Sequence, residues 1–280
     1  MGEQRVRDDG DALAAALALP PNDARREVRL LLAFALDCGF ARLLAHPELA
    51  ADAQSSARYR ACYERRLRGE PVAYITGRRE FYGVEFEVTP AVLIPRPETE
   101  AVVDLALEHL PQASAGTILD LGTGSGCIAV TLAKLRPKAQ VFAVDLSADA
   151  LQVAARNVSR HGVTNVRLLQ GSWYEPVQHR RFDLIVSNPP YVAEGDPHLG
   201  QGDVRFEPRT ALVGGRDGLE AIRTIIAGAS IHLNPGGWLI LEHGFDQQRN
   251  LEQFALDAGF GSLRSHADLA GKPRVLRARL

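Results

Sequence analysis

The first quarter of the chain has the spacing of apolar residues that amphipathic helices require. Between residues 11 and 69, apolar positions recur at intervals near 3.6, as at Leu30, Leu31, Phe34, Leu43 and Leu44. Pro20-Pro21-Asn22-Asp23 interrupts this pattern, and Ser55 is expected to cap a helix that stops at Gly69. The pattern predicts a helical domain over residues 1–71.

The pattern changes to short extended pieces at Val72. Residues 74–76 and 81–88 are rich in β-branched and aromatic side chains, and Gly77 and Gly83 supply turn positions between them. These features predict a β-hairpin linker over residues 72–92.

From residue 93 to residue 280, runs typical of buried strands alternate with helical segments. Strands are expected at 117–121, 141–146, 166–169, 182–187, 238–242 and 274–279, and helices at 125–135, from Ser147 onward, at 219–233 and at 246–258. This alternation indicates a doubly wound, mainly parallel sheet. The predicted fold class is therefore α/β, with a small N-terminal helical domain and a linking β-hairpin.

Composition narrows the function. The chain has 280 residues, of which 46% are hydrophobic and 24% are charged, and this excludes a disordered or collagen-like protein. With a formal net charge of -2, the protein lacks the overall positive potential of a general polyanion binder, so we expect no direct nucleic-acid binding.

The cysteines and the apolar runs bear on location. Cys38, Cys62 and Cys127 lack metal-binding spacing, so we expect reduced thiols and no metal site. No apolar run approaches the ~20 residues of a membrane span, and the short run at 12–19 follows acidic residues, unlike a signal peptide. We expect a cytoplasmic protein with no membrane partner.

A glycine-rich loop follows the strand at 117–121. Its residues are Gly122, Thr123, Gly124, Ser125 and Gly126. The glycines let the backbone approach a ligand closely, and the spacing is G-x-G-x-G rather than the dinucleotide pattern G-x-G-x-x-G. Asp145 ends the next strand, where a carboxylate can accept both ribose hydroxyls. The pattern favours an adenosine-type cofactor without a pyrophosphate over a dehydrogenase cofactor or a purely structural turn.

Asn188-Pro189-Pro190-Tyr191 follows the strand at 182–187, at the edge where such sheets bind ligands. The two prolines fix the backbone, so the Pro189 carbonyl and the Asn188 side-chain oxygen can act as a pair of acceptors for a planar NH2 group. The Tyr191 ring offers a flat stacking face that also favours a nearby cation. The alternative is a rigid turn that ends the strand.

This pair of acceptors suits methylation of a planar nitrogen. An amide or exocyclic amine nitrogen is a poor nucleophile because its lone pair is delocalised. Two hydrogen bonds orient both N–H groups and let the nitrogen pyramidalise toward an electrophilic methyl group, so positioning lowers the barrier without a strong base.

Together, DLGTGSG, Asp145 and NPPY resemble the motifs of class I S-adenosylmethionine-dependent methyltransferases that modify planar amino groups. GEPVAYITGRREFYGVEFEVTPAVLIPRPETE, residues 69–100, resembles the segment that leads into the catalytic domain of protein-(glutamine-N5) methyltransferases of the HemK/PrmC family. QGDVRFEPRTALVGGRDGL, residues 201–219, is similar to the segment that follows NPPY in the release-factor branch.

The resemblance implies a class I, Rossmann-like methyltransferase domain over residues 93–280 that uses S-adenosyl-L-methionine. The substrate would be the glutamine of the Gly-Gly-Gln motif in class I peptide chain release factors. The implied catalytic residues are Asn188, Pro189 and Tyr191, and Pro190 joins them in binding substrate. The implied cofactor-binding residues are Gly122, Thr123, Gly124, Ser125, Gly126, Asp145, Trp173 and Asn188. Ser172 stands where many relatives carry Asp, so Trp173 is the stronger candidate for the adenine side.

The same sequence features are also compatible with other functions. The same acceptors suit adenine N6 in nucleic acid, but that reaction usually needs a basic region that grips the duplex. Glutamine methylation of a ribosomal protein is a second alternative, against which the run at 205–208 argues, and an idle cofactor-binding adaptor is a third. We interpret residues 193–216 as a substrate-facing lid, His243 as a packing residue and the helical domain as a partner-recognition module.

Overall fold

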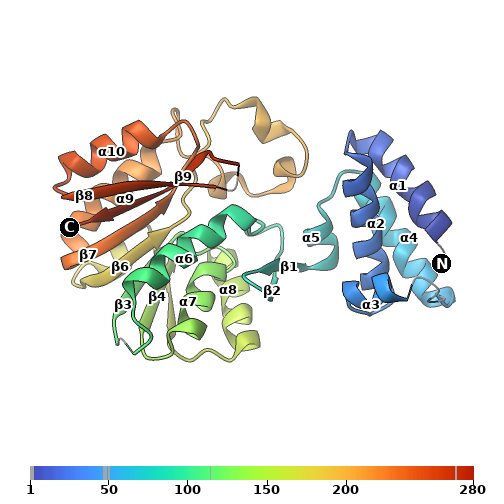
Figure 1. The fold of residues 1–280 in the computed structure, drawn as a ribbon, viewed down its shortest axis with the longest axis horizontal. Coiled ribbons are helices and arrows are strands. Elements are labelled where there is room, and N and C mark those ends of the chain that lie inside the picture. The colour runs from blue at the N-terminus through green and yellow to red at the C-terminus, as the bar shows by residue number, and fades with distance from the viewer. Residues whose placement is uncertain (1–2, 47–48, 50, 114, 269) are drawn as a thin grey trace. The chain divides into compact units, whose positions relative to one another are not determined.

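The computed structural model describes residues 3–46, 49, 51–113, 115–268 and 270–280. The chain divides into two compact units, whose elements are labelled in Figure 1. One unit comprises the described residues up to Arg78 together with Gly200–Phe206, and the other comprises Arg79–Leu199 and Glu207–Leu280. Residues 200–206, which follow NPPY in the sequence, thus belong to the same unit as the N-terminal helices.

The first unit is helical. Its helices are α1 (Glu3–Leu17), α2 (Pro21–Ala35), α3 (Phe40–Ala45), α4 (Ala53–Leu67) and α5 (Val72–Thr76). Its core contains fully buried Leu13, Val28, Leu31 and Tyr59. The Asp52 carboxylate caps α4 by accepting from the Ser55 amide at 2.7 Å, so the prediction of Ser55 as the cap was wrong.

The prediction of an extended segment at 74–76 was also wrong, because these residues form α5. Pro71 precedes the first turn, and Gly77 ends the helix in the left-handed conformation with φ 71°. Ala73, Tyr74 and Ile75 are buried. Burial of these side chains thus outweighs the β propensity of Val72, Tyr74, Ile75 and Thr76.

The hairpin is shorter than the predicted linker. β1 (Arg78–Phe81) and β2 (Val84–Glu87) are joined by Tyr82 and Gly83, both with positive φ, as a type I′ turn requires. Phe81 and Phe86 are buried and contact each other edge to face, with ring centroids 6.1 Å apart. They join the core beneath α6 (Glu100–His109), which follows the 3-10 turn Pro97–Thr99.

The second unit contains a seven-stranded sheet of order β5-β4-β3-β6-β7-β9-β8. Its strands are β3 (Thr117–Leu121), β4 (Gln140–Asp145), β5 (Val166–Gln170), β6 (Phe182–Ser187), β7 (Leu233–Glu242), β8 (Ser262–Ala267) and β9 (Pro273–Arg279). The first five strands in this spatial order run parallel to one another. β9 runs antiparallel to its neighbour β7, and β8 runs antiparallel to β9. The predicted doubly wound, mainly parallel sheet is confirmed, and β8 is an additional strand.

Helices cover both faces of this sheet (Figure 1). They are α6, α7 (Cys127–Leu135) and α8 (Ala148–His161) on one face and α9 (Glu220–His232) and α10 (Gln248–Asp257) on the other. Alternate strand residues such as Ile118 and Leu119 enter opposite cores, as the pleat requires. The predicted helices are confirmed, and the Ser147 hydroxyl caps α8 by accepting from the Ala150 amide at 3.1 Å.

Residues 193–216 contain more regular structure than the sequence indicated. They include the 3-10 turns Pro197–Gly200, Val204–Phe206 and Arg209–Ala211, and a further 3-10 turn lies at Glu175–Val177. Val192 and Val213 pair in an isolated bridge that brings the two ends of the segment together. Of the helices that the structure describes, none is long and apolar enough to cross a bilayer.

Candidate active site

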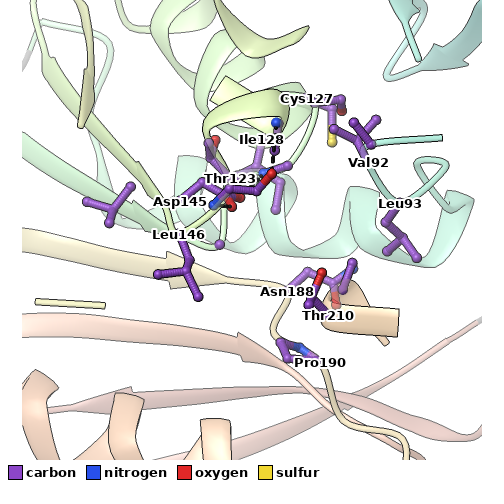
Figure 2. Close-up of a pocket in the computed structure, with 18 of the residues that line it drawn as sticks. Val92, Leu93, Thr123, Cys127, Ile128, Asp145, Leu146, Asn188, Pro190 and Thr210 are labelled. Atoms are coloured by element: carbon purple, nitrogen blue, oxygen red, sulfur yellow. Dashed lines mark hydrogen bonds between the residues drawn. The ribbon is translucent and has the colours of Figure 1, made fainter. Parts of the chain in front are cut away.

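The sheet register brings the sequence motifs together. Leu121 at the end of β3 pairs with Val144 of β4 and with Ser187 of β6, so the glycine loop, Asp145 and NPPY begin at one edge. This is the point where the strand order reverses, the usual ligand site of doubly wound sheets. A cavity of about 380 Å³ lies there, a volume typical of small-molecule sites (Figure 2).

The glycine loop adopts backbone conformations that other residues rarely reach. Gly122, Gly124 and Gly126 have φ values of 70°, 55° and 80°. A Cβ atom on Gly126 would also lie 3.2 Å from the Ala154 Cβ. The loop residues that line the cavity are Gly122, Thr123, Gly124 and Ser125, whereas Gly126 is not among the lining residues.

Asp120 stands behind this loop at the end of β3. It is fully buried, and its Oδ2 accepts a hydrogen bond from Thr123 Oγ1 at 2.6 Å. Burial raises the pKa of Asp120 to about 7, and the nearby Asp145 carboxylate acts in the same direction. The carboxyl group supports the loop from inside the protein.

Asp145 lines the cavity and holds the loop. Its Oδ2 accepts from the Gly124 amide at 2.8 Å, and its Oδ1 accepts from the Ser147 amide at 2.9 Å. Burial raises its pKa, while these two backbone donors lower it. Leu146, the next residue, also lines the cavity and is 68% exposed, so it offers an apolar surface at the rim (Figure 2).

Trp173 lines the cavity together with Gly171 and Ser172. Its φ of 48° is unusual for a bulky residue, which indicates that its surroundings impose the conformation. The ring lies beside the glycine loop, since a Cβ on Gly122 would be 3.7 Å from Trp173 Cζ3. The Ser172 amide donates to Glu175 at 2.9 Å.

Asn188 presents an unpaired acceptor at the cavity. Its Nδ2 donates to Thr99 Oγ1 at 3.0 Å, whereas its Oδ1 is buried with no hydrogen-bond partner among the described residues. A buried polar atom without a partner costs free energy, so it marks a position where a ligand donor fits.

The remaining NPPY residues differ in whether they line the cavity. Pro190 lines the cavity with Asn188, whereas Pro189 is buried and neither it nor Tyr191 is among the lining residues. The Tyr191 hydroxyl donates to Glu242 Oε1 at 3.5 Å, and burial raises the pKa of this phenol.

Sequence reasoning on single residues did not identify much of the cavity wall. The segment before α6 supplies Val92, Leu93, Pro95 and Thr99, and the segment after NPPY supplies Thr210 and Ala211. Both segments carried the family resemblance, and only that signal could have found them. Asn188, Pro190 and Thr210 lie on one side of the cavity in Figure 2.

The surroundings of two further candidate residues, His243 and Glu207, are clear. His243 is fully buried, its Nδ1 contacts the Gly244 carbonyl at 2.8 Å, and burial lowers its pKa, as a packing residue requires. Glu207 is buried and accepts twice from Arg96 at 2.7 Å. Among the residues described, no group of three or more His, Cys, Asp or Glu side chains could hold a metal ion.

Comparisons with known proteins agree with this site. Two family models match: the PrmC N-terminal domain over residues 12–77 and the Methyltransferase small domain over residues 98–202. A release factor glutamine methyltransferase from Xylella fastidiosa is 50% identical over 90% of this chain and 91% of its own. One from Burkholderia pseudomallei is 47% identical over 95% of each chain, and one from Salmonella typhimurium is 42% identical over 90% of each.

Solved structures share the fold. A methyltransferase from Pyrococcus furiosus superposes with a TM-score of 0.55 at 22% identity, over 77% of this chain and 96% of its own. A 16S rRNA N2 G1207 methyltransferase from T. thermophilus, solved with AdoMet and guanosine, superposes with a TM-score of 0.54 at 21% identity. The match covers 72% of this chain and 49% of that chain. The sheet order and the glycine loop at its switch point define a class I methyltransferase. With relatives this similar along nearly the whole chain, the protein belongs to the release factor glutamine methyltransferase family.

Proposed function

We propose that this enzyme transfers a methyl group from S-adenosylmethionine to the side-chain amide nitrogen of the glutamine in the Gly-Gly-Gln motif of class I peptide chain release factors. The observation that carries the proposal is the buried, unpaired Oδ1 of Asn188 beside a glycine-loop cavity. An acceptor in this position suits one N–H of a planar NH2 group. The names of the relatives supply the identity of the protein that carries it.

The residues of the cavity fit S-adenosylmethionine. The Asp145 carboxylate lines the wall where ribose hydroxyls would donate, and Leu146 and Trp173 give apolar surface for an adenine ring. Positive φ values at Gly122 and Gly124 leave room for close backbone approach. Among the described lining residues there is no lysine or arginine, which suits a cofactor with a sulfonium cation and no pyrophosphate.

The bound cofactor would supply an electrophilic methyl group on a positively charged sulfur. The chain's own residues would position the glutamine amide against it. Asn188 Oδ1 would accept one N–H, and the carbonyl of Pro189 would accept the other, so that the nitrogen lone pair points at the methyl carbon. On accepting the methyl group, the glutamine nitrogen would give up one proton to water. No buried strong base is required, because the product amide is neutral once that proton has left.

The helical unit is the proposed recognition module for the release factor, with the PrmC N-terminal domain match over residues 12–77 as support. A cavity of about 380 Å³ can hold a cofactor and one side chain, but it cannot select one protein loop. We therefore expect a much lower KM for a whole release factor than for a short Gly-Gly-Gln peptide. Equal KM values would contradict a recognition role. Because its substrate is part of the translation machinery, the site of action is expected to be the cytoplasm.

A methyl-transfer assay tests the function. The full chain is incubated with methyl-labelled S-adenosylmethionine and a purified class I release factor, and a factor whose Gly-Gly-Gln glutamine is changed to alanine serves as the control. Label is expected in the first protein and not in the second. Equal labelling of the two factors would overturn the proposed substrate.

A further inference from the structure

The NPPY segment needs support from the residues around it. Pro189 and Pro190 have no backbone N–H group, so they cannot donate hydrogen bonds to the rest of the fold. At its start the segment is anchored through β6, where the Ser187 hydroxyl donates to the Leu121 carbonyl at 2.7 Å. The position of the two proposed acceptors therefore also depends on how the other end of the segment, at Tyr191, is fixed.

The Gln247 side chain holds that end. Its Nε2 donates to the Tyr191 carbonyl at 2.9 Å and to the Gly218 carbonyl at 3.2 Å. Its Oε1 accepts from the Gly244 amide at 2.8 Å. All three partners are backbone groups, and a carbonyl can only accept whereas an N–H can only donate, so the direction of this side-chain amide is fixed. One side chain thus joins NPPY, the segment that follows it and the loop after β7.

The loop that carries Gln247 is itself well held. β6 and β7 are neighbouring parallel strands, so the loop after β7 begins beside NPPY. The Gln247 backbone amide donates to the Gly244 carbonyl at 2.9 Å, and the Gly244 amide donates back to the Gln247 side chain. Gln247 then leads directly into α10, whose residue Leu251 is fully buried in the core. Gln247 can therefore support NPPY from behind, and it is not among the residues that line the cavity.

Two glycines let the segment after NPPY approach it closely. A Cβ atom on Gly214 would collide with the Pro190 carbonyl oxygen, and one on Gly218 would collide with the Tyr191 carbonyl oxygen. Gly218 also has a φ of 73°, which other residues rarely adopt. The segment thus lies directly against these two carbonyl groups, and Gln247 joins it to NPPY by donating to both Gly218 and Tyr191.

We propose that Gln247 is a positioning residue for the methyl transfer, and that it acts by holding the Tyr191 carbonyl. With this end of NPPY fixed, the Asn188 oxygen and the Pro189 carbonyl stay where they can accept from the substrate NH2 group. A displacement of about 1 Å at such groups can cost about 100-fold in rate. The inference rests on the proposed function, since it assigns a residue that acts through NPPY.

Two substitutions at residue 247 separate the two ends of the side chain. Gln247→Ala removes all three hydrogen bonds. Gln247→Glu keeps the acceptor for the Gly244 amide, but at about pH 8.5 a glutamate is ionised and has no hydrogen to donate to the two carbonyls. Gln253→Glu is the matched control, because it introduces the same charge at an exposed position of α10.

The measurements are kcat and KM with a purified class I release factor, and the Kd for S-adenosylmethionine from calorimetry. The calorimetric stoichiometry counts the sites that bind cofactor, and kcat is expressed per such site, so unfolded protein does not contribute. We expect both Gln247 variants to lose about 10- to 100-fold in kcat, whereas KM and Kd stay within about twofold of the wild type. Gln253→Glu is expected to match the wild type in all three quantities.

The possible outcomes are distinct. If the wild type methylates no class I release factor, the proposed function fails and this inference fails with it. If the wild type is active and either Gln247 variant matches its kcat per site, Gln247 does not position NPPY. A loss in kcat with an equal loss of cofactor affinity would mean that Gln247 maintains the whole cavity, and the positioning role would be wrong.

Discussion

The Asn157 side chain joins the hairpin to the glycine loop: its Nδ2 donates to the Ser125 carbonyl at 2.8 Å. The same amide bonds both backbone groups of Glu87, since Nδ2 donates to the carbonyl at 3.0 Å and Oδ1 accepts from the amide at 2.8 Å. Asn157 is fully buried on α8. One side chain therefore fixes the end of β2 and the loop that lines the cavity.

Removing this side chain should weaken both the fold and the cofactor site. Asn157→Ala leaves three backbone groups without their partner, and we expect a loss of about 3 kcal/mol in the free energy of unfolding, measured in urea. Affinity for S-adenosylmethionine should fall as the loop loosens. Asn250→Ala on the exposed surface of α10 is the control and should change neither. Unchanged cofactor affinity in Asn157→Ala would show that the loop holds its shape without this contact.

Asp145 should determine cofactor affinity more than stability. Asp145→Ala removes the acceptor for the Gly124 and Ser147 amides as well as the carboxylate offered to the ribose. Since hydrogen bonds to charged groups contribute about 1.5–3 kcal/mol, we expect the Kd for S-adenosylmethionine to rise about 10- to 100-fold in calorimetry. The matched control is Asp149→Ala, an exposed aspartate in the first turn of α8, which should bind as the wild type does. A wild-type Kd in Asp145→Ala would exclude the proposed contact.

The buried Asp120 should make the protein less stable as the pH rises. Its pKa is raised to about 7 in the folded chain, against 3.8 as the ordinary value, so the folded state holds the proton more tightly than the unfolded state does. The contribution is fully present below pH 3.8 and is lost as the pH rises through 7. Between about pH 5 and pH 8 this amounts to roughly 2 to 3 kcal/mol.

Asp120→Asn tests this assignment, because asparagine cannot titrate. Its free energy of unfolding should depend less on pH than that of the wild type over the same interval, when both are measured by urea unfolding. Glu242 acts in the same direction, so part of the pH dependence should remain. An identical pH dependence in Asp120→Asn and wild type would rule out Asp120 as its source.

Arg66 should be critical for the helical unit. It is 2% exposed, and its guanidinium pairs with Glu27 at 2.7 Å and with Asp203 at 2.8 Å. It also donates to the carbonyls of Gly69 and Glu70, each at 3.1 Å. Arg66→Ala leaves the partly buried Glu27 carboxylate and two backbone carbonyls without their partner, and we expect the unit to lose about 3 kcal/mol of stability. Arg68→Ala, on the exposed side of the same turn, should be close to neutral in the same denaturation experiment.

Much of the second unit, which contains the cavity, could be predicted from the sequence. Its local hydrophobic pattern and its overall topology favour the same helices and strands. The strands from 117 to 242 are apolar runs between helices, and their order follows the rules of doubly wound sheets. The β8 strand was missed, since Ser262–Ala267 is an edge strand in which no residue is buried, and only its pairing with β9 makes it a strand. Likewise, α5 depends on tertiary burial that no local propensity reports.

The residues of the site likewise divide into those that sequence motifs predict and those that only the folded structure brings together. Asp145, Trp173 and Asn188 stand in motifs, so their place at the cavity could be predicted. Thr99 could not be connected to Asn188 from the sequence, since the two are 89 positions apart and their hydrogen bond forms only because the turn before α6 reaches the edge where β6 ends.

The most direct measurement follows the Gly-Gly-Gln peptide of a release factor by mass spectrometry after incubation with wild type or Asn188→Ala. Cofactor affinity is measured by calorimetry on the same preparations. We expect the wild type to add one methyl group to the glutamine. We expect Asn188→Ala to bind S-adenosylmethionine nearly as well and to lose about 100-fold or more in kcat, by analogy with the loss of a group that stabilises a transition state. A methyl group on a different residue, or a wild-type rate in Asn188→Ala, would contradict the account.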